Sequence, residues 1–168
     1  LITAKSAPVF GGVYKLAAVE DEQGNIIPKI KVSENTAKIT NPHFKKVYRF
    51  YDNESGKALA DELCVYDETI DSTKPHTIFD PDAIWKTKTL TDYTARELHV
   101  TVFKNGELVY KQPSLYEIRI YCAEQLETLW DEVKRFENPH TYYVDLSKKL
   151  WEIKNTLLEK SKDGKNLK

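Results

Sequence analysis

The sequence contains no methionine and only two cysteines among its 168 residues. A chain that lacks an initiator methionine and opens on the apolar run 1–3 is expected to be a portion of a longer protein, preceded by another element. The formal net charge of −1 excludes bulk attraction to nucleic acid or to an anionic membrane. No stretch has the length of a transmembrane helix and no signal segment is present. These absences indicate a cytoplasmic protein with neither a nucleic-acid nor a membrane partner.

The few cysteines and histidines show no spacing typical of a site. Cys64 and Cys122 lie far apart, in strand-like and helix-like contexts, and are interpreted as reduced core residues rather than a disulfide. A metal site would have to gather the histidines from distant segments; these are His43, His76, His99 and His140. A phosphate loop, a Cys-x-x-Cys pair, a His-Glu-x-x-His helix and a nucleophile elbow are all missing. The sequence therefore predicts no catalytic residue and no metal ligand within the chain.

Two pairs of acidic residues have the look of paired catalytic carboxylates. They are Asp80 with Asp82 and Asp67 with Glu68. Neither pair is followed by the glycine and the terminal glutamate of a calcium loop. Short acidic side chains also bond readily to nearby backbone amides, so both pairs are interpreted as solvated turns and helix caps.

The chain before Pro113 has the short apolar segments and frequent turn signals of a small antiparallel β-structure. Three hairpins are predicted: residues 13–19 with 26–32, residues 46–51 with an apolar run ending at Tyr66, and residues 98–104 with 107–111. The clearest turn is Asn105-Gly106, because this dipeptide favours the type I′ turn, whose twist matches that of paired strands.

Beyond Pro113 the apolar spacing changes to that of helices. Ser114 and Glu117 form a capping box, and apolar residues at spacings of three and four predict one long helix over 114–136 with a buried stripe. A second helix is predicted to begin near Ser147. The predicted fold class is therefore α+β, with a small antiparallel β-sheet region followed by two C-terminal helices packed on it.

The first 19 residues contain a glycine pair that leads into a lysine-bearing strand. Gly11 and Gly12 allow positive φ and close approach by a ligand, and Lys15 follows on the strand. Lys29 and Lys31 alternate with apolar residues, so both are expected to point to one face of the partner strand. A solvated strand face that blocks sheet-to-sheet association explains the lysines. A positive patch that binds phosphate oxygens explains them equally, so these five residues are the candidate phosphate- or substrate-binding positions.

Residues 11–16, Gly-Gly-Val-Tyr-Lys-Leu, resemble a segment of nicotinate phosphoribosyltransferases that follows the phosphate-binding end of their barrel. Further segments resemble that family in the same order: residues 31–35, 38–42, 44–49, 77–81 (as in its bacterial branch), 113–119, 135–139 and 142–147. The chain thus resembles the C-terminal portion of such an enzyme. Residues 1–19 would continue from an upstream catalytic domain, and residues 20–168 would form the C-terminal α+β domain.

The resemblance implies a full-length enzyme of NAD biosynthesis. It would join nicotinate to 5-phosphoribosyl 1-pyrophosphate, giving nicotinate mononucleotide and pyrophosphate, with ATP hydrolysis, Mg²⁺ and an upstream phosphorylated histidine. It would be a homodimer. No ATP or Mg²⁺ site is expected within this chain, which alone is expected to be structural and inactive. The resemblance favours a phosphate contact for Lys15, whereas the argument for Lys29 and Lys31 depends on strand geometry.

A free-standing module that binds a protein or single-stranded nucleic acid is the alternative. The chain has ten tyrosines and three tryptophans. Tyr14, Tyr48 and Tyr51 lie near lysines and Arg49, as an aromatic stacking platform requires. The absence of a nucleic-acid signature argues against this reading, and so does the frequency with which strand tyrosines are half-buried.

Overall fold

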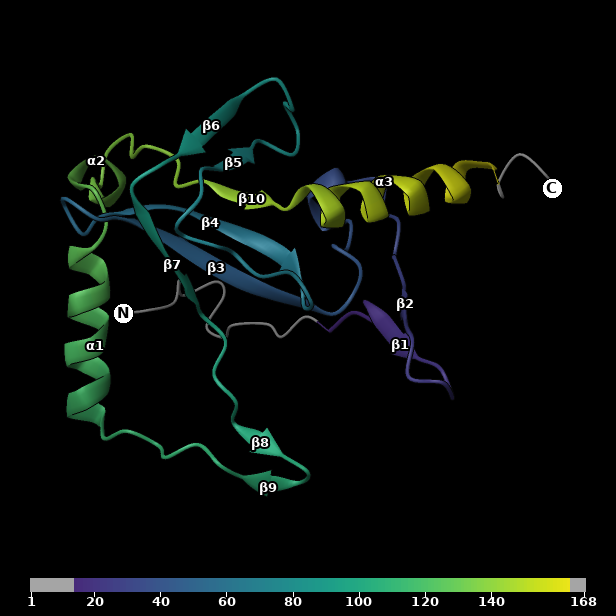
Figure 1. Cartoon of the computed structure of the whole chain (residues 1–168), viewed down its shortest axis with the longest axis horizontal. Helices are drawn as coiled ribbons and strands as arrows, with labels where there is room; N and C mark the ends of the chain where they lie inside the picture. Colours follow the sequence, from purple (N-terminus) through teal and green to yellow (C-terminus); the bar gives the residue numbers. More distant parts are fainter. Residues whose placement is uncertain (1–13, 164–168) are drawn as a thin grey trace, which may run out of the picture. The chain divides into compact units, whose positions relative to one another are not determined.

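The computed structural model describes residues 14–163. The chain divides into two compact units (Figure 1). The terminal unit takes in the residues up to Phe44 and those from Ile153 onward, and the central unit is Lys45–Glu152. The predicted division after residue 19 stays a prediction.

The terminal unit contains the first predicted hairpin, in a shorter form. β1 (Ala18–Glu20) pairs antiparallel with β2 (Ile26–Pro28). The Asp21 carboxylate closes the turn between them, because it accepts the backbone N–H groups of Gln23 and Asn25 at 2.9 and 2.8 Å. A short 3₁₀ helix, η1 (Thr36–Lys38), follows.

A four-stranded sheet forms the centre of the central unit, in the order β10-β4-β3-β7. Its strands are β3 (Lys45–Asp52), β4 (Ala58–Val65), β7 (Tyr93–Glu97) and β10 (Val144–Leu146). The β3–β4 hairpin confirms the second prediction, and β7 adds to β3 antiparallel. The sequence did not indicate β10, which comes from beyond the first helix and pairs parallel to β4.

Two further hairpins belong to the same unit. β5 (His76–Phe79) pairs with β6 (Thr87–Leu90), and β8 (Phe103–Lys104) pairs with β9 (Glu107–Leu108), both antiparallel. At the β8–β9 turn φ is 52° for Asn105 and 83° for Gly106, which confirms the predicted turn, since type I′ needs two positive φ values. The β8–β9 ribbon lies apart from the four-stranded sheet (Figure 1).

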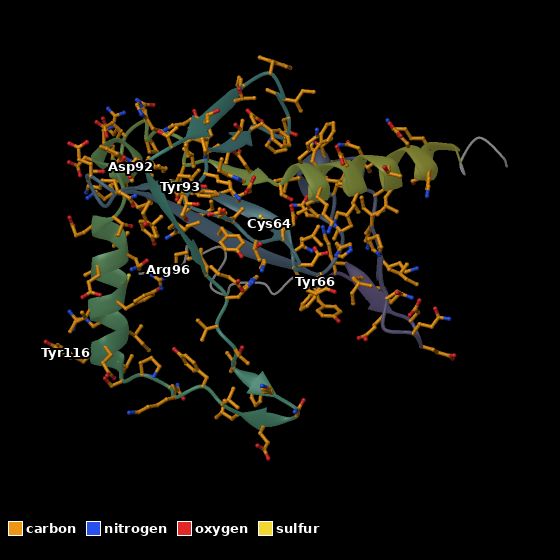
Figure 2. The ribbon with its side chains drawn as sticks, in the orientation of Figure 1. Cys64, Tyr66, Asp92, Tyr93, Arg96 and Tyr116 are labelled. Carbon is orange, nitrogen blue, oxygen red and sulfur yellow. The ribbon has the colours of Figure 1, made fainter. Side chains whose placement is uncertain are left out.

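The hydrophobic core lies on one face of the four-stranded sheet. Phe50 and Cys64 are fully buried there, and the Phe50 ring meets Tyr93 edge-on with centroids 5.5 Å apart. Cys64 and Tyr93 are both labelled on the strands in Figure 2. Ile78 and Leu90 of the β5–β6 hairpin belong to the same buried cluster. Each large apolar side chain buried in this way contributes about 1.5–3 kcal/mol.

The helical region differs from its prediction in two respects. The apolar stripe predicted to be buried is not, because none of the residues of α1 is buried. The capping box is confirmed, but the predicted single helix over 114–136 is wrong: α1 (Leu115–Glu127) ends, and the one-turn α2 (Asp131–Lys134) follows. The main-chain oxygens at the end of α1 have partners outside the helix. Thr128 O accepts the Ala58 N–H at 2.7 Å, and Lys57 Nζ donates to Glu127 O at 2.6 Å. These bonds to the start of β4 take up carbonyls that a continuing helix would use.

The predicted second C-terminal helix is confirmed as α3 (Lys148–Asp163). Ser147 Oγ caps its start by accepting the Leu150 N–H at 3.2 Å, and Leu150 is fully buried. The Trp151 ring packs edge-on against Phe79, with centroids 6.1 Å apart. The fold class is therefore α+β as predicted, with several small, mostly antiparallel sheets and C-terminal helices. Among the described helices, none has the length and apolar character needed to cross a membrane.

Candidate functional site

Three of the five predicted phosphate-binding residues, Lys15, Lys29 and Lys31, are described by the structure and lie in the terminal unit. Gly11 and Gly12 are outside the described residues. Lys15 is exposed, and its ammonium donates to the main-chain oxygen of Lys38, at the end of η1. Lys15 therefore contacts its own unit and caps the end of η1, as lysines near helix C-termini commonly do.

Lys29 and Lys31 are both exposed, but the strand argument that grouped them is wrong. β2 ends at Pro28, so neither lysine belongs to that strand. Lys29 N donates to Ala17 O at 2.8 Å, and Thr40 N donates to Lys31 O at 3.5 Å. The structure therefore brings Lys15 and Lys31 against the same segment, 38–40, through one side-chain contact and one backbone contact.

Arg49 does not belong to an open basic patch. It lies on β3 directly opposite Asp61 of β4, with Nε and Nη2 at 2.7 and 2.8 Å from the two carboxylate oxygens. The Tyr142 hydroxyl donates to the same carboxylate at 2.8 Å, and its ring lies 5.7 Å from the guanidinium carbon. Burial, together with the Asp61 charge, raises the pKa of Tyr142, and the hydrogen bond from Arg49 to Asp61 raises the pKa of the guanidinium. This is a paired, structural cluster.

Glu62, the next residue of β4, lies on the core face with its carboxylate almost fully buried. Its Oε2 is 2.8 Å from His76 Nε2 and 3.6 Å from Cys64 Sγ. Burial and then the Glu62 charge raise the pKa of the Cys64 thiol, which opposes nucleophilic reactivity. Cys64 is thus the buried, reduced residue that was predicted, whereas Cys122 on α1 is exposed and the core prediction for it is wrong.

The aromatic platform of the alternative reading is not formed. Tyr48 is 7% exposed and belongs to the core cluster, and Tyr51 is half-buried with its hydroxyl 3.5 Å from Gln125 Oε1. Tyr14 is 94% exposed. A stacking surface needs several ring faces open to solvent together, and of these three only Tyr14 is.

One residue of each acidic pair, Asp80 or Glu68, bonds to backbone amides as predicted, whereas Asp67 forms an ion pair with Lys149 at 2.8 Å. Asp80 Oδ1 accepts the backbone N–H groups of Asp82 and Ala83 at 2.9 and 3.2 Å, which closes the turn after β5. Glu68 Oε2 accepts the Val65 N–H at 2.6 Å and the hydroxyl of Ser147, the cap of α3, at 2.8 Å.

An apolar surface covers much of the helical and β8–β9 region of the central unit. None of the residues of α1 is buried, and Tyr116 near its start is 72% exposed and projects away from the sheet (Figure 2). The other exposed apolar residues of this helix are Leu115, Ile118, Ile120, Tyr121 and Leu126. Phe103 and Leu108 of the β8–β9 ribbon are also exposed. Exposed apolar residues in this number are a feature of surfaces that contact a partner.

A cavity of about 160 Å³ lies between the β5–β6 hairpin and β10. Asp145 of β10 lines it and is 5% exposed. Burial, with added repulsion from Asp80 and Glu62, raises the pKa of Asp145 to about 6. This residue was missed, although one signal was visible: a lone carboxylate inside the otherwise apolar run 142–146. A second cavity of about 460 Å³ is lined partly by Trp130, His140 and Tyr142.

Comparisons with known proteins give a consistent family. Residues 44–154 match the family described as the nicotinate phosphoribosyltransferase C-terminal domain. The chain is 38% identical over 154 residues to the nicotinate phosphoribosyltransferase of Bacillus subtilis, covering 92% of this chain and 31% of that protein. Identity to the enzyme of that name from Caenorhabditis elegans is 31% over 159 residues, covering 94% of this chain and 27% of that protein.

The fold agrees with this match. The crystal structure of human nicotinic acid phosphoribosyltransferase superposes with a TM-score of 0.63 at 26% identity, covering 70% of this chain and 23% of that one. The chain therefore spans less than a third of the length of each of these proteins. Since the family match takes in the central sheet, both β-hairpins around it and the start of α3, the chain belongs to the nicotinate phosphoribosyltransferase family, as its C-terminal domain.

Proposed function

We propose that this chain is the C-terminal domain of an enzyme that makes nicotinate mononucleotide and pyrophosphate from nicotinate and 5-phosphoribosyl 1-pyrophosphate, with ATP hydrolysis. The observation that carries the proposal is the family match over residues 44–154. The superposition on the human enzyme supports it independently of the sequence motifs. The complete protein is proposed to be a cytoplasmic homodimer in NAD biosynthesis.

Within that enzyme the central unit is proposed to be structural. Its buried polar clusters are internally paired: Arg49 with Asp61, and Glu62 with His76. Its apolar α1 surface is proposed to pack on the remainder of the enzyme or on a second subunit, since exposed apolar area of this kind is stabilised by a partner. The chain by itself is proposed to have no phosphoribosyl transfer activity.

Mg²⁺ is proposed to be held outside this domain. Among residues 14–163 there is no group of three His, Cys, Asp or Glu side chains that could hold a metal ion. The described residues therefore do not fit a Mg²⁺ site, and no step of the reaction is assigned to them through that ion.

Lys15 is proposed to act on phosphate oxygens of 5-phosphoribosyl 1-pyrophosphate or ATP, with Gly11 and Gly12 allowing close approach. Loss of pyrophosphate puts negative charge on the leaving oxygens, which a fixed ammonium stabilises. Lys29 and Lys31 are secondary candidates, supported by their exposure and by the contact of Lys31 with segment 38–40, which Lys15 also touches. In the structure Lys15 is held by Lys38 O, so it would have to exchange that carbonyl for a phosphate.

Product analysis of the complete protein tests the activity. Incubation with 5-phosphoribosyl 1-pyrophosphate, ATP and either nicotinate or nicotinamide should yield nicotinate mononucleotide from the acid alone. The 168-residue chain, assayed in parallel, should release no pyrophosphate. Formation of nicotinamide mononucleotide as the main product of the complete protein would overturn the assignment.

A further inference from the structure

The cavity beside Asp145 is lined by both charged and apolar residues. Asp145 lies on β10 in parallel register with Glu62 of β4, and the other charged residues of the lining are Asp80, Lys86 and Lys88. Leu59, Ile78, Phe79 and Tyr143 form the apolar part of the lining. All of these residues belong to the central unit, and β5, β6 and β10 can be followed in Figure 1.

The carboxylate of Asp145 has no paired side chain in the part of the chain that the structure describes. The residue is only 5% exposed, yet none of the side chains in 14–163 hydrogen-bonds or ion-pairs with it. This is unusual, because buried carboxylates are normally paired or hydrogen-bonded. The neighbouring acids illustrate the rule: Asp61 is paired with Arg49, and Glu62 with His76.

The charges that surround Asp145 do not supply the missing partner. Asp80, on the turn after β5, and Glu62, on β4, both repel it. Lys86 lies at the cavity, but its ammonium is 3.6 Å from Asp80 Oδ2 and so is already engaged. Lys88 also lines the cavity without an ion pair to Asp145 among the described side chains. Asp145 therefore lines the cavity as a carboxylate that no cationic side chain among residues 14–163 pairs with.

We propose that this cavity binds a guanidinium group, with the Asp145 carboxylate as its counter-ion. Two parallel N–H donors match the two oxygens of a carboxylate, which makes the guanidinium–carboxylate pair strong and directional. The Phe79 and Tyr143 rings that line the cavity can lie against the planar cation.

The size of the cavity limits the ligand. An engineered apolar cavity of about 150 Å³ holds one benzene molecule. The cavity here, about 160 Å³, therefore has room for an alkylguanidinium head. The group can come from a free alkylguanidinium compound or from an arginine side chain of a neighbouring polypeptide segment. Both present the same chemistry to Asp145.

Isothermal titration of the complete protein with methylguanidinium tests the proposal, at constant ionic strength and pH 7.5. Saturable binding is expected, and Asp145→Asn should weaken it at least tenfold. Asp82 is an exposed carboxylate in the turn after β5 and does not line the cavity, so Asp82→Asn should leave the affinity for methylguanidinium unchanged. Tetramethylammonium, which has no N–H donor, should not bind. Binding at pH 5 should be about tenfold weaker, because protonation of Asp145 competes with the cation.

A second titration with the peptide acetyl-Gly-Arg-Gly-amide distinguishes the two sources. Binding of methylguanidinium but not of the peptide indicates a free small ligand. Binding of the peptide with equal or greater affinity indicates an arginine side chain. Absence of binding by either probe, or equal binding by the parent protein and Asp145→Asn, overturns the proposal. The proposal is also overturned if the Lys88→Ala variant binds methylguanidinium and the parent protein does not. Lys88 would then be the counter-ion of Asp145.

Discussion

Arg49 on β3 and Asp61 on β4 lie directly opposite each other and are joined by two parallel hydrogen bonds of 2.7 and 2.8 Å. Tyr142 adds a third hydrogen bond to the same carboxylate from the segment that precedes β10. The β3–β4 hairpin and a segment far away in the sequence are therefore tied to one buried carboxylate. Because Asp61 is 8% exposed, the pair is protected from the screening that weakens surface ion pairs.

Arg49→Met should destabilise the central unit by about 3–5 kcal/mol, because it leaves the Asp61 charge buried without a counter-ion. Hydrogen exchange of the β3 and β4 backbone amides in the complete protein measures the loss as a lower opening free energy. The double variant Arg49→Met with Asp61→Leu removes both charges and should recover most of it. An unchanged opening free energy in the single variant would show that the pair contributes nothing.

Asp145→Asn should make the protein more stable at neutral pH. The pKa of Asp145 is about 6 in the folded state, above the ordinary 3.8, so the folded state binds this proton more tightly. The resulting stabilisation is complete below pH 4 and is lost as the pH rises through about 6. The uncharged asparagine avoids the loss, giving a gain of about 2–3 kcal/mol at pH 7.5 in buffer without organic cations. Urea denaturation at pH 4 and pH 7.5 checks this, and the two proteins should differ little at pH 4.

Leu150→Ala in α3 should lower the stability of the chain much more than Leu126→Ala in α1. Leu150 is fully buried, so its truncation should cost about 2–5 kcal/mol. Leu126 is 49% exposed, so its truncation in the 168-residue chain should cost less than about 1 kcal/mol. Thermal denaturation of this chain compares the two. In the complete enzyme a much larger cost at Leu126 would indicate that the α1 surface is covered there.

Lys15→Ala in the complete enzyme should lower kcat/KM for 5-phosphoribosyl 1-pyrophosphate by about a hundredfold, by analogy with loss of one preorganised donor worth about 2.7–4 kcal/mol. Lys104→Ala, in the exposed β8–β9 ribbon, is the matched control and should have no effect. If Lys15 serves only to cap η1 through Lys38 O, the substitution should lower the melting temperature slightly and leave the kinetics unchanged.

Local chemistry accounts for the elements that were predicted correctly. The Asn105-Gly106 turn, the capping box at Ser114 and the Ser147 cap of α3 depend on residues a few positions apart. Such contacts form in the same way whatever the remainder of the chain does. The end of α1 was missed because Lys57 and Ala58 supply its hydrogen bonds from β4, far away in the sequence.

The candidate site was harder to derive than the fold. Lysine spacing indicated a basic strand face, but β2 ends at Pro28 and so does not include Lys29 and Lys31. Asp145 appeared only as one acidic residue in an apolar run. The raised pKa of Asp145 depends on its burial and on the charges of Asp80 and Glu62, which the folding of distant segments brings to it.

The sequence by itself determined the family, the fold class, the hairpin turns and the helix caps, because each is written in short segments that act locally. Only the tertiary structure decided that β10 joins the sheet parallel to β4, that Arg49 is paired rather than free, and that Asp145 is buried with no paired side chain among residues 14–163. Parallel pairing of β10 joins residues separated by a long stretch of chain, and the Arg49–Asp61 pair depends on the register of the β3–β4 hairpin. Their geometry therefore follows from how the elements pack, which short-range patterns do not specify.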